Sequence, residues 1–141
     1  MKEIKTAVTN YFVNFANYRG ITGKNEYFFS VCFGLALLSS VELLLKFIGF
    51  GANAFFVVDT ILLIPMLTLC ARRLNDAGKN WIFAFAIMLP SPFNLILIAY
   101  LLVIKGKKVE HFSNSFTNAT YVMLALYGLL KIVGNMFIPV A

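Results

Sequence analysis

Long apolar runs alternate with short polar segments along the chain, and they predict membrane-spanning helices. Apolar residues dominate 27–50, and further apolar runs occupy 55–71, 81–104 and 121–140. A helix of about 20 apolar residues crosses a hydrocarbon core about 30 Å thick. We therefore predict an all-α integral membrane protein, one domain over residues 1–141, with a small bundle of three to four transmembrane segments.

Residues 1–19 follow a different pattern, with apolar residues at steps of three and four. These are Ile4, Val8, Tyr11, Phe12, Phe15 and Tyr18. Such spacing places them on one face of a helix. The segment therefore predicts an amphipathic helix, which lies on the membrane surface, packs on the cytoplasmic end of the bundle, or does both. The next segment, 18–24, predicts a turn, in which Gly20 and Gly23 permit positive φ angles.

Basic residues gather on one side of this bundle. Four Lys or Arg residues precede residue 27, none lies in 49–53, and three follow the second apolar run. Because cytoplasmic loops carry excess Lys and Arg, we expect a multi-pass protein of a bacterial inner membrane with a cytoplasmic N-terminus. The net charge of +6 would suggest nucleic acid in a soluble protein. Here the bases stand at the ends of apolar runs, which indicates anionic lipid headgroups and no nucleic acid.

The third apolar run, 81–104, contains a break at Pro90-Ser91-Pro92. Each proline removes a backbone donor and disfavours helix in the residue before it. A kinked single crossing would place Lys105, Lys107 and Lys108 outside. A re-entrant hairpin would return them to the cytoplasmic side, which gives ten basic residues inside and none outside, and the charge pattern favours it.

The polar stretch "CARRLNDAGKNW", residues 70–81, follows the second span. Arg72 and Arg73 suit the negative end of that helix, residues 75–78 predict a turn, and Asn80 predicts an N-cap. We favour this structural interpretation. The functional alternative is a cytoplasmic site for an anionic headgroup or phosphate. Its candidate residues are Lys24, Glu26, Arg72, Arg73, Asp76 and Lys79.

Within that set, Glu26 begins the first span and the two arginines end the second. Adjacent antiparallel spans bring these ends to one depth, so we expect Glu26 to pair with Arg72 or Arg73, with Asp76 nearby. Four more charges fall inside the apolar runs, where an unpaired charge is costly. They are Glu42, Lys46, Asp59 and Lys131.

Glu42, Lys46 and Asp59 are expected to form a cluster that joins the first two spans, because Glu42 and Lys46 share a helical face. The cluster is either structural or part of an ion path, and we favour the structural role. Lys131 lies in the middle of its run and needs an acidic partner, a carbonyl or a partner subunit.

Reactive groups are sparse. Cys32 and Cys70 lie in apolar runs and are interpreted as small apolar fillers. The single histidine, His111, follows Glu110 in a polar loop, and neighbours in sequence do not make a catalytic pair. Because no nucleophile elbow or metal-ligand spacing is present, we expect no enzyme activity, no metal and no cofactor.

Two motifs resemble a known family. "YRGITGKNEYF" is similar to its Phe-x-Gly-Arg, two residues, Arg-x-Glu-Tyr-Trp pattern, and "RRLNDAGKNW" is similar to Arg-Arg-Leu-His-Asp-x-Gly-x-Ser. This is the YhaH-like family of small bacterial inner-membrane proteins, domain of unknown function 805. The resemblance covers about residues 11–112 and implies a membrane location without a biochemical activity. Ile21 stands where the family has arginine and Asn75 where it usually has histidine.

We expect a non-enzymatic role, as an accessory or scaffold subunit of a membrane assembly that contacts the bilayer and either self-associates or binds a membrane-protein partner. The alternative is a small channel or transporter, or a pore-forming, holin-like protein, with the buried charges along its path. An enzyme that acts on lipid comes third.

Overall fold

The chain folds into helices throughout the part that the computed structural model describes, which comprises residues 2–89, 92–107 and 114–137. Within these residues there is no strand, so the all-helical prediction is confirmed. The elements are α1 Lys2–Val13, α2 Lys24–Ile48, α3 Ala52–Asp76, the 3-10 helix η1 Trp81–Met88, α4 Phe93–Val103 and α5 Asn114–Phe137.

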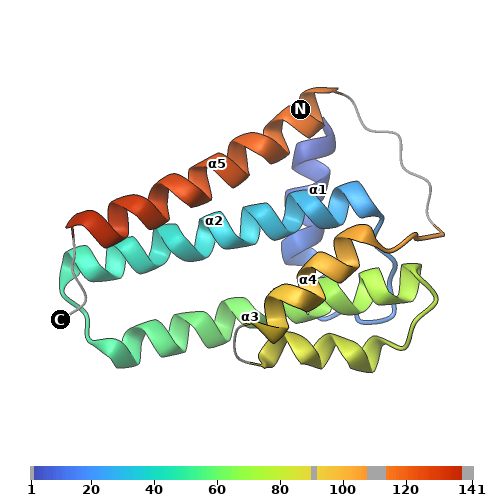
Figure 1. The fold of residues 1–141 in the computed structure, drawn as a ribbon, viewed down its shortest axis with the longest axis horizontal. Helices are drawn as coiled ribbons and strands as arrows, with labels where there is room; N and C mark the ends of the chain where they lie inside the picture. Colours follow the sequence, from blue (N-terminus) through green and yellow to red (C-terminus); the bar gives the residue numbers. More distant parts are fainter. Residues whose placement is uncertain (1, 90–91, 108–113, 138–141) are drawn as a thin grey trace.

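Three long helices form the body of the molecule. α2 lies between α3 and α5 and packs against both (Figure 1). α3 returns antiparallel to α2 after the turn at Gly49, whereas α5 runs parallel to α2, because Phe28 contacts Tyr121 near one end and Glu42 contacts Lys131 toward the other. α2 and residues Asn53–Asp76 of α3 are each long and apolar enough to cross a membrane.

The helices begin and end at residues that differ from the sequence predictions. α2 covers most of the expected span 27–50, but α3 extends five residues beyond the expected end at residue 71. Asn75 and Asp76 therefore belong to the last helical turn, so their assignment to a turn was wrong. Gly78, with φ 70°, provides the reversal instead.

α5 starts at Asn114, whereas the last span was expected over 121–140. The predicted polar loop is therefore shorter than its sequence suggested, because polar residues form the first turns of this helix. Residues 138–141 lie outside the described part. The apolar stretch of α5 covers Asn118–Val133, which is shorter than the two candidate spans.

α1 packs across α2, α3 and α5 near the beginning of α2 (Figure 1). Ala7 is buried against Phe29, and the hydroxyl of Tyr11 lies over Gly34. A Cβ at Gly34 would come within 2.7 Å of that hydroxyl oxygen, so the glycine permits the close crossing. Of the two arrangements predicted for this helix, the structure shows the packed one.

η1 and α4 divide the third apolar run into two short pieces. Pro90 and Ser91 lie outside the described residues. η1 begins beside the end of α3, and the chain returns there after α4, where the backbone N–H of Lys107 donates to the Asp76 carbonyl at 2.9 Å. Figure 1 shows η1 running away from the end of α3 and α4 running back toward it. The chain therefore leaves the end of α3 and comes back to it within residues 81–107.

One end of the molecule therefore collects the start of α2, the ends of α3 and α4, and the start of α5. We call it the basic end, after its Lys and Arg residues. The main core lies just inside it, where Tyr27 and Val31 of α2 meet Cys70, Ala71 and Leu74 of α3.

Candidate functional site

Arg73 is the centre of the polar arrangement at the basic end. Its side chain is 1% exposed, and its Nη1 lies 2.5 Å from Oδ2 of Asp76, one helical turn further along α3. Nε donates to the carbonyl of Leu101 at 3.1 Å, and Nη2 donates to that of Ile104 at 2.7 Å. One guanidinium therefore neutralises a buried carboxylate and caps the C-terminal carbonyls of α4, where a cation is favourable.

Asp76 also contacts the segment that follows α4. Besides its ion pair, its backbone carbonyl accepts from the N–H of Lys107. Gly106 lies directly on the carboxylate, and a Cβ at this position would overlap it. Arg73 and Asp76 of the sequence Arg-Arg-Leu-Asn-Asp thus hold the end of α4 and the segment after it against the end of α3.

Asn75 binds the segment between α1 and α2 to the end of α3 in a similar way. Its Nδ2 donates to the carbonyls of Tyr18 at 2.6 Å and Gly20 at 3.2 Å. A neutral amide suits this position, because both partners are acceptors and the group is partly buried. The two sequence motifs are therefore complementary, since the second satisfies the backbone of the first.

Arg72 and Glu26 form a second buried pair. Arg72 Nη2 lies 4.0 Å from Glu26 Oε1 and donates to the Ile21 carbonyl at 3.3 Å. Asn10 of α1 donates to the same carboxylate oxygen at 3.1 Å. The structure thus brings Glu26 and Arg72 together, as expected, whereas Arg73 takes Asp76 as its partner. Arg72 Nε is buried without a hydrogen-bond partner in the described residues.

The glycines of the first motif serve close packing rather than special backbone angles. Within the described part of the chain, positive φ occurs only at Gly49 and Gly78, so Gly20 and Gly23 do not use the positive φ that glycine permits. A Cβ at Gly20 would come within 3.0 Å of Arg72 Nε. Gly20 is needed because the guanidinium passes over it.

Burial separates the candidate headgroup residues into two groups. The side chains of Glu26, Arg72, Arg73 and Asp76 are buried and contact protein groups. Lys24 and Lys79 are exposed, and further exposed cations surround them at this end. These are Arg19, Lys105 and Lys107.

The charges toward the opposite end pair differently from the prediction. Lys131 Nζ of α5 lies 2.9 Å from Glu42 Oε2 of α2. Among these described charges, no ion pair joins Lys46 to Glu42 or Asp59, whereas Glu42 and Lys131 both act electrostatically on Asp59. Lys131 therefore takes the place that was expected for Lys46. The sequence placed Glu42 with its i+4 neighbour, but the helix packing brings it to α5.

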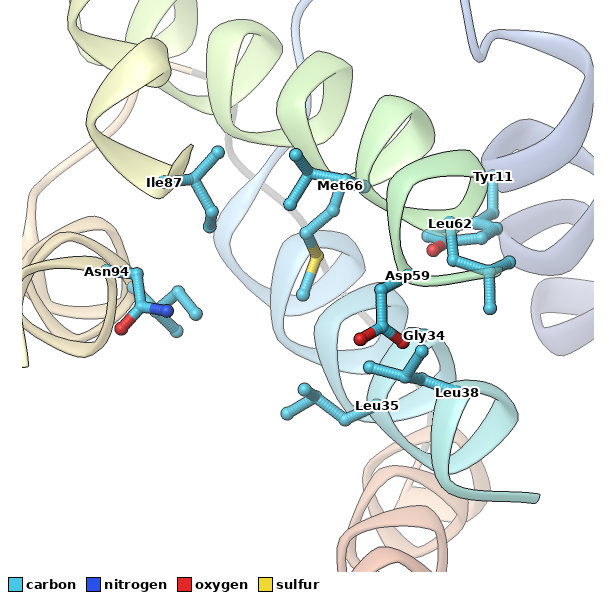
Figure 2. Close-up of a pocket in the computed structure, with 11 residues that line it drawn as sticks. Tyr11, Gly34, Leu35, Leu38, Asp59, Leu62, Met66, Ile87 and Asn94 are labelled. Carbon is cyan, nitrogen blue, oxygen red and sulfur yellow. The ribbon is translucent and has the colours of Figure 1, made fainter. Parts of the chain in front are cut away.

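Asp59 instead lines a cavity of about 250 Å³ between α2, α3, η1 and α4. Figure 2 shows its carboxylate directed toward α2, with Leu35 and Met66 around the same space and Asn94 across from it on α4. Tyr11 closes one side. Burial raises the pKa of the Tyr11 phenol to about 12, so it keeps its proton and stays a donor.

Several of these groups had no sequence signal. Asn94 lies in an apolar run, and its Oδ1 is buried with no hydrogen-bond partner among described residues. Asn10 and Gly106 gain their roles only through tertiary contact. Asn80 was predicted correctly, since its side chain accepts from the N–H of Ile82 at 3.1 Å.

Reactive chemistry is limited in the described residues. No group of three or more His, Cys, Asp or Glu side chains there could hold a metal ion. Cys32 and Cys70 are both buried, and the Cys70 sulfur lies 3.7 Å from the Tyr27 hydroxyl. They behave as the small apolar fillers that their positions predicted.

Comparison with known proteins gives one match. The family model described as "Protein of unknown function (DUF805)" matches residues 15–118, which include both motifs, η1 and α4. No curated protein and no solved structure matches the chain.

Proposed function

The chain belongs to the family described as Protein of unknown function (DUF805), and from its geometry we propose that it is a non-enzymatic, multi-pass protein of a bacterial inner membrane. Its role is that of an accessory or scaffold subunit. The observation that carries this proposal is the use of both motifs for internal contacts. The side chains best suited to chemistry, Arg72, Arg73, Asp76 and Glu26, are buried and bind backbone carbonyls or each other.

Membrane embedding is supported by where the apolar surface lies. α2 and α3 are long enough to cross, and large apolar side chains are exposed along α3 and α5, a pattern that water would penalise. Examples are Phe56, Val57, Ile61, Val122, Leu129 and Ile132. The basic residues of the described loops lie at one end, as the positive-inside rule requires of a cytoplasmic face.

Contact with anionic lipid belongs to the exposed cations of the basic end. Lys24, Lys79, Lys105 and Lys107 project from different segments that the buried ties hold together. Lysines near a negative leaflet each contribute about 1 kcal/mol of attraction. The buried arginines maintain the shape of this face, and the lysines contact the headgroups.

Topology is tested by single cysteines at Lys79 and Gly51 in a Cys32→Ser/Cys70→Ser background, labelled with an impermeant maleimide in spheroplasts. Gly51→Cys should react in intact cells, and Lys79→Cys only after lysis. Carbonate washing should leave the protein in the membrane pellet. Labelling of Lys79→Cys in intact cells, or release by carbonate, would overturn the membrane placement.

The accessory role is tested by purification from native membranes after in-cell crosslinking. A partner, or a second copy of the chain, should copurify at fixed stoichiometry in mild detergent. A chain that purifies alone as a monomer with and without crosslinking would contradict the role. The control is Lys79→Gln, which alters the lipid-facing surface and should leave a protein partner bound.

The Asp59 cavity favours a second candidate, a small channel or transporter. A carboxylate and an amide face a space within the predicted membrane region, which is typical of a substrate path. Reconstitution into liposomes and measurement of ion flux tests it, with Asp59→Asn as the variant expected to lose any flux.

A further inference from the structure

The cavity between α2, α3, η1 and α4 combines one charge with apolar walls. Leu35, Leu38, Leu62 and Met66 are among its apolar lining residues, and Asp59 supplies a carboxylate. Asn94 and Tyr11 provide the other polar groups, an amide and a phenol from different elements. Sites for small molecules have this composition, with apolar lining and a few polar groups that fix orientation.

The carboxylate of Asp59 has no ion-pair partner among the described residues. The ammonium of Lys131 forms its ion pair with Glu42 at 2.9 Å, and both of these charges also act on Asp59 from a greater distance. Asp59 is seven residues into α3, about 10 Å from the start of the helix. An ionised carboxylate at such a position in a membrane protein is costly unless a cation neutralises it.

Asn94 adds an independent signal. Its Oδ1 is buried without a partner in the described part of the molecule, although buried side-chain oxygens normally accept a hydrogen bond. Asn94 lies on α4, opposite Asp59 (Figure 2). Asn94 therefore adds a polar amide to the cavity from a second element.

We propose that this cavity binds a small organic cation that carries apolar substituents, with the positive centre at Asp59 and the apolar part among the leucines and Met66. The volume of about 250 Å³ lies just below the usual range for ligand pockets, about 300–1,000 Å³, so it suits a molecule with a single ring. The Tyr11 ring adds a surface that attracts cations.

This assignment goes beyond the accessory role and rests on the proposed membrane location. That location supplies the apolar surroundings in which the carboxylate favours a cation over a neutral molecule of the same shape. The two are tested separately. Carbonate extraction and maleimide labelling examine the location, and the titration below examines the cavity in purified full-length protein.

Benzyltrimethylammonium is the probe, because its charge is permanent. Neopentylbenzene is the matched control, because carbon replaces nitrogen and the shape is unchanged. The full chain in an uncharged maltoside detergent is titrated with each and binding is followed by calorimetry. The wild type should bind the cation, and Asp59→Asn should weaken that binding at least about tenfold. Neopentylbenzene should show no difference between the two proteins.

Thr60→Val is the matched variant, because its neighbouring hydroxyl bonds only to its own helix, at the Phe56 carbonyl. It should bind the cation as the wild type does. Should Asp59→Asn fail to fold, Leu38→Trp fills the cavity while it keeps the carboxylate, and it should also lose binding. Binding by Asp59→Asn within twofold of the wild type, or no binding of the cation to the wild type at millimolar concentration, would overturn the assignment.

Discussion

Replacement of Arg73 by methionine should be among the most damaging substitutions in this chain. The change keeps an unbranched, flexible side chain, shortens it, and removes its charge and all its donors. It deprives Asp76 of its cation and leaves the carbonyls of Leu101 and Ile104 without their donors. Asp76 is itself buried, so water cannot replace the lost contacts easily.

The magnitude follows from these contacts. Loss of one partner of a buried ion pair costs about 3–5 kcal/mol, and each hydrogen bond from a charged group contributes about 1.5–3 kcal/mol. These terms overlap because one group makes them all, so they do not add. We expect the free energy of local unfolding at the basic end to fall by about 3–5 kcal/mol, which corresponds to about 100- to 4,000-fold more frequent opening there.

Cys70 provides the assay. It is completely buried in the turn that precedes Arg73, so its reaction with a maleimide in a Cys32→Ser background reports local opening. Arg73→Met should accelerate this reaction by that factor. Adding Asp76→Asn should restore part of the protection, because it removes the buried carboxylate that Arg73 neutralised.

Arg19→Met is the control, since Arg19 is an exposed arginine in the segment between α1 and α2, and it should change the labelling rate little. If Arg73→Met accelerated labelling less than about fivefold, or if the double variant opened as readily as the single one, the guanidinium would not be holding α4 against α3.

Three further substitutions test separate contacts. Gly34→Ala should weaken α1 packing by about 1–3 kcal/mol and expose that helix to protease, and Tyr11→Phe should restore protection by removing the hydroxyl that the new methyl meets. Glu42→Lys should lower the thermal midpoint, and the exchange Glu42→Lys/Lys131→Glu should recover it; an unchanged midpoint in the single variant would argue against the pair at 2.9 Å. Asn75→Ala should cost about 1–3 kcal/mol and shift the emission of the single tryptophan, which stacks near Tyr18.

The sequence predicted the helical class and the gathering of charge at one end because both depend on residue type along a single helix. The pairing of Glu26 with Arg72 was also accessible, because antiparallel helices joined by a short turn must place those ends together. Asn80 could be assigned as a cap because its partner is only two residues away.

Contacts between distant helices could not be predicted in this way. Glu42 has a lysine at i+4 on its own helix, yet its partner is Lys131, 89 residues away. The acceptors of Arg73 are backbone carbonyls, and a carbonyl leaves no mark in the residue type of Leu101 or Ile104. Helix ends were misplaced for a related reason, since Asn75 and Asp76 are stabilised in helix by tertiary partners that outweigh their usual preference for turns.

The guanidinium of Arg73 also has a consequence for the order of biosynthesis. Its two carbonyl acceptors belong to residues that are made about 30 positions later. When α3 has just been made, these acceptors are therefore still inside the ribosome. In the membrane location proposed above, that end of the helix would have to stay in contact with water or phosphates at the surface of the bilayer until those residues are made. A chain truncated before residue 101 would lack both carbonyl acceptors of Arg73.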